Sequence, residues 1–452
     1  MKPLVKTQRE RMLKSSVLRY HWNKSIPMEM IQTASSDISW SHMGARASDA
    51  VITKLMADAI NIPGILSLAA GFTDNAVLPA QLIEDAVSEL THRVDSREFL
   101  QYGTNIGRRG LREQALQLLN SNPGEGGAHL TVDDAFISNG SQQALYLAAQ
   151  VLCNEGDIVL VEEPTYFVFL ELLKGMNLCP ISIPLNSDNQ IDFNTLTELV
   201  HFLQARGEWN RVKMIYLIGY YSNPSSRSLS YNEKKQLGLF LQKLDRQIPV
   251  IEDAAYRSLY FDSMCNVPSL LGMSEWENYP VLYTGTFTKP FSTGLKVGYS
   301  ICNNQSWLQR MLRIKGHQDF GTSNFSQAIV EHVLESDRYQ SHLEKIRSHY
   351  KRKMLLLDAA LREGGVDKNG WSWDIPEGGL YLWLKGPDHV DTSMDSDFCK
   401  AALDEKILYV PGDLCISGNM KKNCVRLSFG ALDESRLTEA GLRFAKIAVR
   451  FS

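Results

Sequence analysis

Lys289 closes the stretch Thr284–Lys289, directly after a short apolar run. A lysine amine is a nucleophile only without its extra proton, and burial beside other positive groups makes that proton easier to lose. Thr286, Thr288 and Lys296 add two hydroxyls and a cation that suit a phosphate. Because most loop lysines are simply solvated, Lys289 alone decides nothing.

Asp253 follows the apolar run Pro249–Ile251, and Tyr256 stands three residues further on. A carboxylate at the end of a buried strand can pair with a pyridinium nitrogen and keep it protonated, so that the ring accepts the electrons of a carbanion. The Tyr256 hydroxyl could bond an oxygen on the same ring. An aspartate that only caps a loop is the competing interpretation.

Gly140, Ser141 and Gln142 open a helical pattern at Gln143–Leu152. Backbone N–H groups at a helix N-terminus bind anions, and glycine lets the chain approach a ligand closely. The sequence therefore offers a phosphate site here. An ordinary capped loop is the competing interpretation.

Arg426 lies between apolar residues of an expected strand at Asn423–Ser428. An arginine whose charge is simply solvated is not expected between apolar residues of a strand. The planar guanidinium suits two parallel hydrogen bonds to a carboxylate, and a structural ion pair is an equal alternative.

Each of these groups belongs to a short apolar run or its end, and helical patterns separate the runs. Five runs have the length and composition of buried strands: Asp157–Glu162, Val212–Ile218, Ile248–Glu252, Val281–Thr284 and Leu295–Ile301. Strands that alternate with helices predict an α/β fold with a mostly parallel sheet flanked by helices. Ligands of such sheets gather beyond the carboxyl ends of the strands, where these candidate groups fall.

The chain is long enough for more than one core, and its pattern changes near residue 330. A long polar helical pattern at Ile329–Arg362 leads into three expected strands: Gly379–Lys385, Ile407–Val410 and Asn423–Ser428. We therefore expect a large domain over residues 75–330 and a smaller α+β domain over residues 331–452. Residues 1–74 are too few and too irregular to fold alone, so we expect an arm that becomes part of the small domain.

The 452-residue chain is 44% hydrophobic and 22% charged, with a formal net charge of −4. This ordinary composition gives no reason to expect nucleic acid or an anionic membrane as a partner. Its apolar runs are too short to span a bilayer, and Glu10 interrupts the basic start of the chain in a way that disfavours a transit peptide. The seven cysteines form no C-x-x-C pair, so we expect reduced thiols, a cytoplasmic location and no metal.

Together, the motifs resemble the fold-type I aminotransferases that depend on pyridoxal 5'-phosphate (PLP), and most closely their kynurenine/α-aminoadipate subgroup. The resemblance runs from about Ile65 to Ala448. It implies a Schiff base between PLP and Lys289, with Asp253 at the pyridinium nitrogen and Tyr166 stacked on the ring as the other catalytic residues.

Further roles carry over residue by residue. The implied cofactor-binding set is Gly140, Ser141, Gln142, Tyr166, Asn223, Asp253, Tyr256, Thr286, Thr288, Lys289 and Lys296. Substrate binding is implied for Gly71, Asn223 and Arg426, whose guanidinium would hold the α-carboxylate. Tyr102 would reach the phosphate of the neighbouring subunit, so the resemblance also implies a homodimer with shared active sites.

Several positions depart from the family's usual pattern. Lys296 stands where an arginine is common, Thr286 and Thr288 replace serines, and Asn223–Ser226 reads Asn-Pro-Ser-Ser in place of Asn-Pro-Thr-Gly. The changes keep the chemical groups but alter the cup and the cleft, which favours a specialised enzyme.

The leading hypothesis is amino-group transfer between an L-amino acid and a 2-oxo acid, with Lys289 moving the proton. The second keeps PLP but ends in elimination, replacement, oxidation or cyclisation, which the same scaffold supports. A regulator that uses the fold as a sensor is the third, and only about 65 residues precede the match where a DNA-binding domain would stand. Arg46, Phe72, Arg227 and Arg257 are open candidates for the side-chain pocket.

Overall fold

The computed structural model describes residues 39–47, 51, 53, 57, 61–93, 97–125, 129–418 and 422–452. The basic start of the chain, and with it most of the arm expected over residues 1–74, lies outside these residues.

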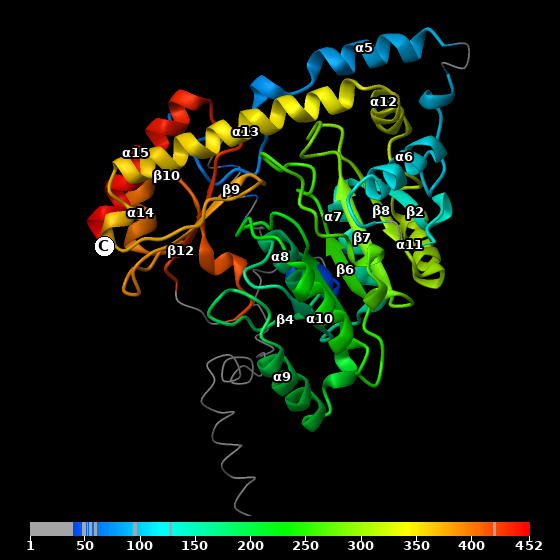
Figure 1. Ribbon diagram of the computed structural model, residues 1–452, viewed down its shortest axis with the longest axis horizontal. Coiled ribbons are helices and arrows are strands. Elements are labelled where there is room, and N and C mark those ends of the chain that lie inside the picture. Colours follow the sequence, from blue (N-terminus) through cyan, green and yellow to red (C-terminus); the bar gives the residue numbers. More distant parts are fainter. Residues whose placement is uncertain are drawn as a thin grey trace, which may run out of the picture.

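A seven-stranded sheet forms the centre of the described chain. Its strands are β2 (Ala135–Asn139), β3 (Ile158–Val161), β4 (Cys179–Ser182), β5 (Val212–Ile218), β6 (Val250–Asp253), β7 (Val281–Thr286) and β8 (Val297–Cys302). Their spatial order is β2-β8-β7-β6-β5-β3-β4. Strand β8 runs antiparallel to β2 and β7, and the other neighbouring strands are parallel. The expected mostly parallel α/β sheet is confirmed (Figure 1).

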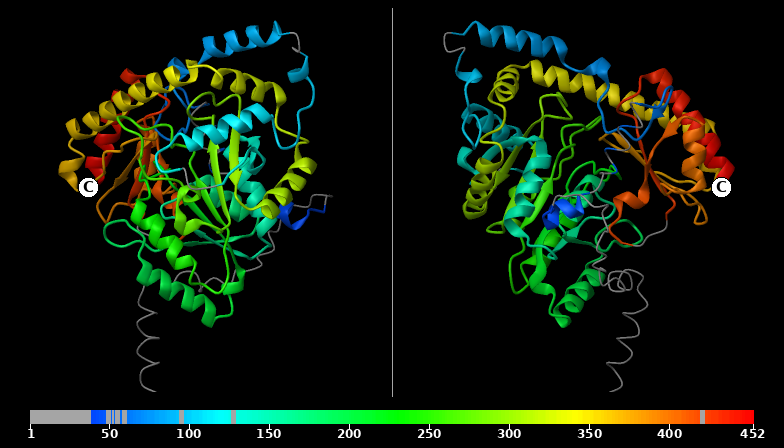
Figure 2. Two further views of the ribbon diagram at one scale, coloured as in Figure 1. Left: turned by 45° about the vertical axis from the view of Figure 1, so that its right-hand side comes forward. Right: turned by 180° about the vertical axis from the view of Figure 1, so that it is seen from behind.

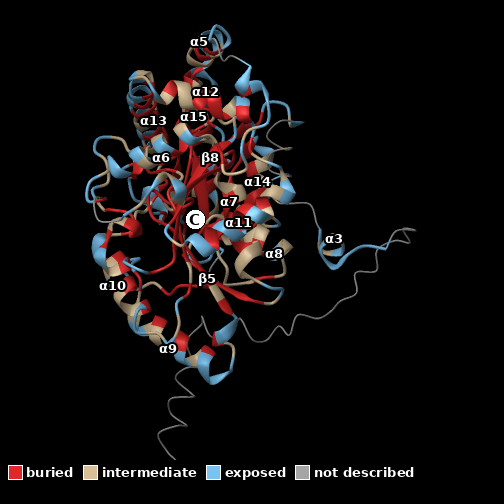
Figure 3. Ribbon diagram, turned by 90° about the vertical axis from the view of Figure 1, so that its right-hand side faces the viewer, coloured by how far each residue is buried: buried red, intermediate tan, exposed pale blue. Residues whose placement is uncertain are grey.

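Helices cover both faces of this sheet. One face packs against α7 (Gly140–Leu152), α8 (Phe167–Gly175) and α11 (Gln305–Gln318). The other face shares its core with α6 (Arg109–Asn120), α9 (Phe193–Ala205), α10 (Tyr231–Leu241) and α12 (Asn324–Leu334). In β5, Met214 and Tyr216 belong to the first core, whereas Ile215 and Leu217 belong to the second. Burial on both faces explains why the strands are apolar throughout, and Figure 3 shows β5 and β8 buried between helices with exposed outer faces.

A smaller group of strands lies beside the large sheet. Its antiparallel sheet joins β11 (Val410–Pro411), β12 (Cys424–Ser428) and β9 (Tyr381–Lys385), and β1 (Leu66–Ser67) pairs in parallel with β10 (Ile407–Leu408). The remaining helices are α3 (His42–Arg46), α5 (Ala80–Thr91), α13 (Arg338–Glu363), α14 (Asp397–Asp404) and α15 (Glu434–Phe451). The pairing of β1 with β10 attaches the segment before residue 74 to the C-terminal part of the chain.

The single long helix expected over Ile329–Arg362 is wrong, because the chain breaks there into α12 and α13. The break falls at Glu335–Asp337, where the Ser336 hydroxyl donates a hydrogen bond to the Val333 carbonyl. Serine and aspartate offer the backbone such local alternatives to helix, and they therefore favour helix ends.

Helix α13 bridges the two parts of the molecule. Its 26 residues give a length of about 39 Å. Near its start, Tyr339 contacts Phe287 and Phe291, which flank Lys289 in sequence, whereas its other half packs on α15. Both views of Figure 2 show α13 running from the large sheet's helices to the smaller part.

Candidate active site

The carboxyl ends of β2, β5, β6 and β7 lie along one edge of the large sheet, and a cavity of about 500 Å³ opens beside them. That volume is typical of a cofactor or small-molecule site. Thirteen of the fourteen candidate residues line the cavity: Gly71, Gly140, Ser141, Gln142, Tyr166, Asn223, Asp253, Tyr256, Thr286, Thr288, Lys289, Lys296 and Arg426. The exception is Tyr102.

Lys289 lies three residues beyond the end of β7, and its Nζ donates a hydrogen bond of 2.6 Å to the Gly71 carbonyl oxygen. Burial lowers the pKa of Lys289, and the positive charges of Arg426 and Lys296 lower it further. The amine is therefore closer to its neutral, nucleophilic form than a solvated lysine is.

Asp253 ends β6 and is 5% exposed. Its Oδ2 accepts a hydrogen bond of 2.9 Å from the Tyr216 hydroxyl, and its Oδ1 accepts one of 3.0 Å from the Ala255 N–H. Burial raises the pKa of the Asp253 carboxyl to about 6, although these hydrogen bonds offset part of that effect. A cationic ring nitrogen beside it would favour the ionised carboxylate.

Tyr216 is a residue that the sequence did not reveal. It lies inside β5 and is fully buried, and its hydroxyl is what orients Asp253. The available signal was a tyrosine in a strand buried on both faces, because a buried tyrosine hydroxyl usually finds a polar partner.

The cup for an anion forms where α7 begins. Gly140 has a φ of +66°, which glycine adopts without strain. A Cβ on Gly298 of β8 would lie 2.4 Å from the Gly140 carbonyl carbon, so only glycine permits this approach. Thr286 Oγ1 donates to Thr288 Oγ1 over 2.8 Å, which brings the two hydroxyls together, and Lys296 lines the same cavity.

Arg426, on β12, is 2% exposed and forms no ion pair with a described residue. Its Nη1 donates to Asn223 Oδ1 over 2.8 Å, and its Nη2 donates to the Ala69 carbonyl over 2.6 Å. Its Nε has no hydrogen-bond partner within the described chain. The structure thus disfavours a structural ion pair, one of the two interpretations of Arg426, and leaves the guanidinium suited to an incoming carboxylate.

A second tyrosine missed from the sequence is Tyr381, the first residue of β9. It lines the cavity, and its hydroxyl lies 2.9 Å from that of Tyr256. The strand itself was expected, but the alternation of side chains along it cannot say which element from elsewhere in the chain its first residue meets.

Of the four candidates for a side-chain pocket, only Phe72 lines this cavity. The three arginines pair with acids instead: Arg46 with Glu155, Arg227 with Glu233, and Arg257 with Glu125. Glu155 and Glu125 lie more than 100 residues from their arginines, so sequence spacing could not reveal these two pairs; Glu233 follows Arg227 by six residues.

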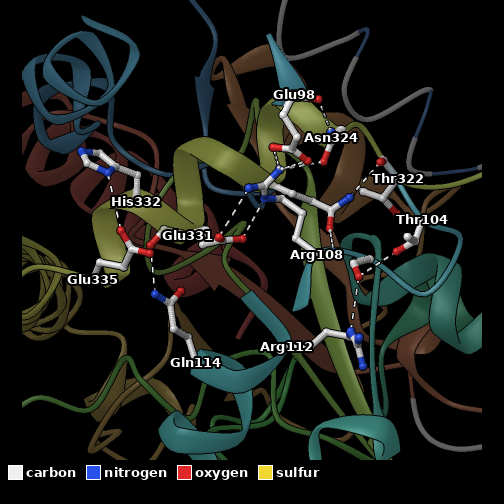
Figure 4. Close-up of polar contacts among 12 residues, drawn as sticks. Glu98, Thr104, Arg108, Arg112, Gln114, Thr322, Asn324, Glu331, His332 and Glu335 are labelled. Carbon is white, nitrogen blue, oxygen red and sulfur yellow. Dashed lines mark hydrogen bonds and ion pairs between the residues drawn. The ribbon is translucent and has the colours of Figure 1, made fainter. Parts of the chain in front are cut away.

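Tyr102 lies on the surface, 85% exposed, on a loop that Arg108 holds in place. In Figure 4 the Arg108 side chain points toward Glu98 and toward Asn324 and Glu331 of α12. Its side chain bonds Glu98 over 2.8 Å, Glu331 over 2.7 Å and Asn324 over 3.1 Å. The loop is therefore fixed to α12, and it presents Tyr102 outward.

Charges in the cavity fit PLP. Among the described residues that line it, Lys289, Lys296 and Arg426 are cationic and Asp253 is the one carboxylate. This surplus suits a phosphate together with a substrate carboxylate, and the Gln142 Oε1 is a further buried atom with no partner in the described chain. Among the residues that the structure describes, no cluster of metal-ligating side chains occurs. The cavity therefore offers a suitable partner to each charged group of PLP.

Comparison with known proteins gives the family. Residues 63–443 match the model of aminotransferase class I and II, and the chain belongs to this family. It is 29% identical to aromatic-amino-acid aminotransferase 1 of Thermococcus litoralis over 89% of this chain and 92% of the relative. PLP is its cofactor and amino-group transfer its reaction, as the sequence predicted, and nothing in the comparisons favours elimination or cyclisation.

Two examples come from the solved structures that share the fold. The kynurenine aminotransferase of Pyrococcus horikoshii has a TM-score of 0.80 at 28% identity, and the match covers 91% of this chain and 97% of that one. The α-aminoadipate aminotransferase of Thermus thermophilus, solved with N-(5'-phosphopyridoxyl)-L-leucine, has a TM-score of 0.77 at 26% identity and the same coverage. The predicted subgroup is thereby confirmed. None of the helices in the described ranges has the length and apolarity to cross a membrane.

Proposed function

We propose that this aminotransferase works at the cavity beside β6 and β7, with PLP attached to Lys289. The observation that carries the proposal is that Lys289, Asp253 and the cup at Gly140 line one cavity of about 500 Å³. These groups match the aldehyde, the ring nitrogen and the phosphate of a single cofactor. The domain limits at residues 75 and 330 stay predictions.

Each group has a distinct task. PLP, when bound, supplies a ring that accepts the electron pair released at the substrate Cα. Asp253 holds the positive charge of the ring nitrogen, and the cup binds the phosphate. Once the substrate amine has displaced it, Lys289 Nζ takes the proton from Cα as a general base and later returns a proton as a general acid.

We propose that Arg426 binds the α-carboxylate of the substrate. Its guanidinium is buried and lacks a carboxylate partner among the described residues, and its Nε is unsatisfied. Asn223, which accepts from Nη1, is placed to hold the guanidinium at the required angle. Gly71 leaves room beside Lys289 for the substrate.

For the substrate side chain we propose an aromatic amino acid. Phe72 and Ile218 line the cavity, and among its described lining residues Arg426 is the single arginine. With that arginine occupied by the α-carboxylate, this subunit offers no second guanidinium to an acidic side chain. The relative in Thermococcus litoralis is named for aromatic substrates.

A half-reaction screen tests the function and the substrate class. The PLP-loaded protein is mixed with single amino acids while the cofactor absorbance is followed. Loss of the PLP band with phenylalanine, and its return on addition of a 2-oxo acid, is expected. 2-Aminoadipate should react about tenfold more slowly or worse, because a buried unpaired charge costs more than 1.4 kcal/mol. Release of ammonia without return of the band would rule out transamination.

We also propose a homodimer that completes each active site with Tyr102 from the other subunit. Tyr102 lies in an exposed apolar patch with three other residues: Leu100, Phe320 and Phe325. The Tyr102 and Phe320 rings contact edge to face, with centroids 5.7 Å apart. Exposed apolar patches of this kind mark interfaces, and the fixed loop behind this one suits a second copy of the chain.

Phe320→Glu is expected to weaken self-association at least about tenfold, because it places a charge in an apolar interface. Sedimentation of the purified protein measures the change as a shift from dimer toward monomer. Ile375→Glu, at an exposed apolar residue outside the patch, is the matched control and should leave the mass unchanged. A Phe320→Glu protein that remains fully dimeric would exclude this patch as the interface.

We propose a cytoplasmic location as well. No disulfide joins any of the seven cysteines. Chains whose cysteines are all free are usual in reducing compartments.

A further inference from the structure

Tyr381 has the position of a residue that acts on the reaction without touching the reacting atoms. It is 1% exposed overall, yet it lines the cavity. Its hydroxyl lies 2.9 Å from the Tyr256 hydroxyl, and the two rings meet edge to face at 74° with centroids 5.7 Å apart. A hydrogen bond therefore joins a tyrosine of the turn after β6 to the first tyrosine of β9 inside the candidate active site.

The same hydroxyl lies close to Lys289 across Gly71. A Cβ on Gly71 would lie 3.1 Å from the Tyr381 hydroxyl and 3.9 Å from Lys289 Nζ. Lys289 in turn bonds the Gly71 carbonyl. Arg426 lies over the Tyr381 ring, with its guanidinium carbon 4.2 Å from the centroid, and this cation–π contact holds the ring in place.

The number of available protons decides which of the two tyrosines donates the hydrogen bond. A tyrosine hydroxyl carries one proton and can accept other hydrogen bonds. If the Tyr256 hydroxyl donates its hydrogen bond to the ring oxygen of PLP, it can only accept a hydrogen bond from Tyr381. Tyr381 must then be the donor of the pair.

We propose that Tyr381 is a positioning residue, whose hydroxyl donates to Tyr256 and so directs the Tyr256 proton to the ring oxygen of PLP. This inference rests on the proposed function, since it needs PLP on Lys289. Hydrogen bonds in a chain polarise one another, so Tyr256 becomes a stronger donor when Tyr381 donates to it. A stronger donor stabilises negative charge on the ring oxygen.

That oxygen shares a proton with the nitrogen that joins Lys289 to the cofactor. Loss of the Tyr381 hydroxyl therefore raises the affinity of this oxygen and nitrogen for the proton that they share. The charged and titratable groups that line the cavity around Lys289 and its cofactor are otherwise Asp253, Lys296, Arg426 and three tyrosines, Tyr166, Tyr216 and Tyr256. The substitution at Tyr381 changes none of them.

The test is Tyr381→Phe, which keeps the ring under Arg426 and removes only the hydroxyl. The absorbance of the PLP-loaded protein is titrated with pH without substrate. The midpoint is expected to rise by about 0.3–1 pH unit, the scale of one hydrogen bond. An unchanged midpoint overturns the inference, because a residue that only packs would not move it.

Two further variants separate the possible causes. Tyr256→Phe should raise the midpoint more, and adding Tyr381→Phe to it should cause no further rise, since Tyr381 acts through Tyr256. A further rise in the double variant overturns this route. Tyr409→Phe is the matched control, because its hydroxyl donates to the Thr392 carbonyl away from the cavity, and it should leave the midpoint unchanged.

Failure of the proposed function would look different. In that case the unsubstituted protein would show no PLP band tied to Lys289, so that there would be no midpoint to compare. This result overturns both statements. A normal band and midpoint that do not respond to Tyr381→Phe overturn the inference alone.

Discussion

Lys289→Ala is expected to abolish covalent attachment of PLP and to lower the rate of the half-reaction by at least about 10³-fold. Two tasks fall on the same amine, which first holds the cofactor and then moves the proton at the substrate Cα. Burial and the charges of Arg426 and Lys296 lower its pKa. Among the described residues that line the cavity, Lys296 is the one other lysine that could take on both tasks.

Lys296→Ala is therefore the matched control. It removes a cation from the same cavity, so the affinity for PLP should fall while the attachment to Lys289 persists. Borohydride reduction followed by peptide mass spectrometry reports which lysine carries the cofactor. If reduced Lys289→Ala protein still carries PLP on a specific lysine, the assignment of Lys289 is wrong.

Asp253→Asn is expected to slow the half-reaction by about 10²–10³-fold, the usual scale for removing one electrostatic stabiliser. The amide has almost the same shape: its oxygen can accept from the Ala255 N–H while its NH2 donates to the Tyr216 hydroxyl oxygen, but it carries no negative charge. It therefore cannot hold a proton on the ring nitrogen, and the electron pair from Cα is less well accommodated. PLP should still attach to Lys289.

Single-turnover mixing with substrate measures the rate, and the absorbance before mixing confirms that the variant is loaded. Asp262→Asn is the control, at an exposed carboxylate that pairs with Lys351 on the surface. It should react at the unsubstituted rate. A full rate in Asp253→Asn would mean that another group stabilises the ring nitrogen.

Local sequence predicted the large sheet well. Strands such as β5 and β7 are apolar throughout because helices cover both of their faces. This apolar pattern does not depend on the order of the strands in the sheet, so it can be recognised from the sequence. The candidate residues at their ends could be grouped because parallel strands end at one edge. Asp253 and Lys289 thus line one cavity. Arg426 reaches the same cavity from the middle of β12 in the small sheet, which this rule does not cover.

The residues that were missed depend on contacts between segments. Tyr216 matters because β5 lies next to β6, and Tyr381 matters because β9 meets the loop after β6. No local pattern carries this information. The same reason applies to the arginine candidates: only the fold brings Glu125 beside Arg257, so the sequence cannot separate Arg257 from a ligand-binding arginine. The break between α12 and α13 has a local cause at Ser336, but the long polar helical pattern around it favoured one continuous helix.

Arg426 also has a mechanical meaning. It stands on β12 of the small sheet, and its hydrogen bonds reach Asn223 beyond β5 and Ala69 beyond β1. A carboxylate that takes over the Nη1 donor removes the hydrogen bond that joins β12 of the small sheet to the segment after β5, and replaces it with a contact through the ligand. Substrate binding and the relative position of the two parts are then thermodynamically coupled. A substrate that favours one arrangement of the two parts is bound more tightly in that arrangement.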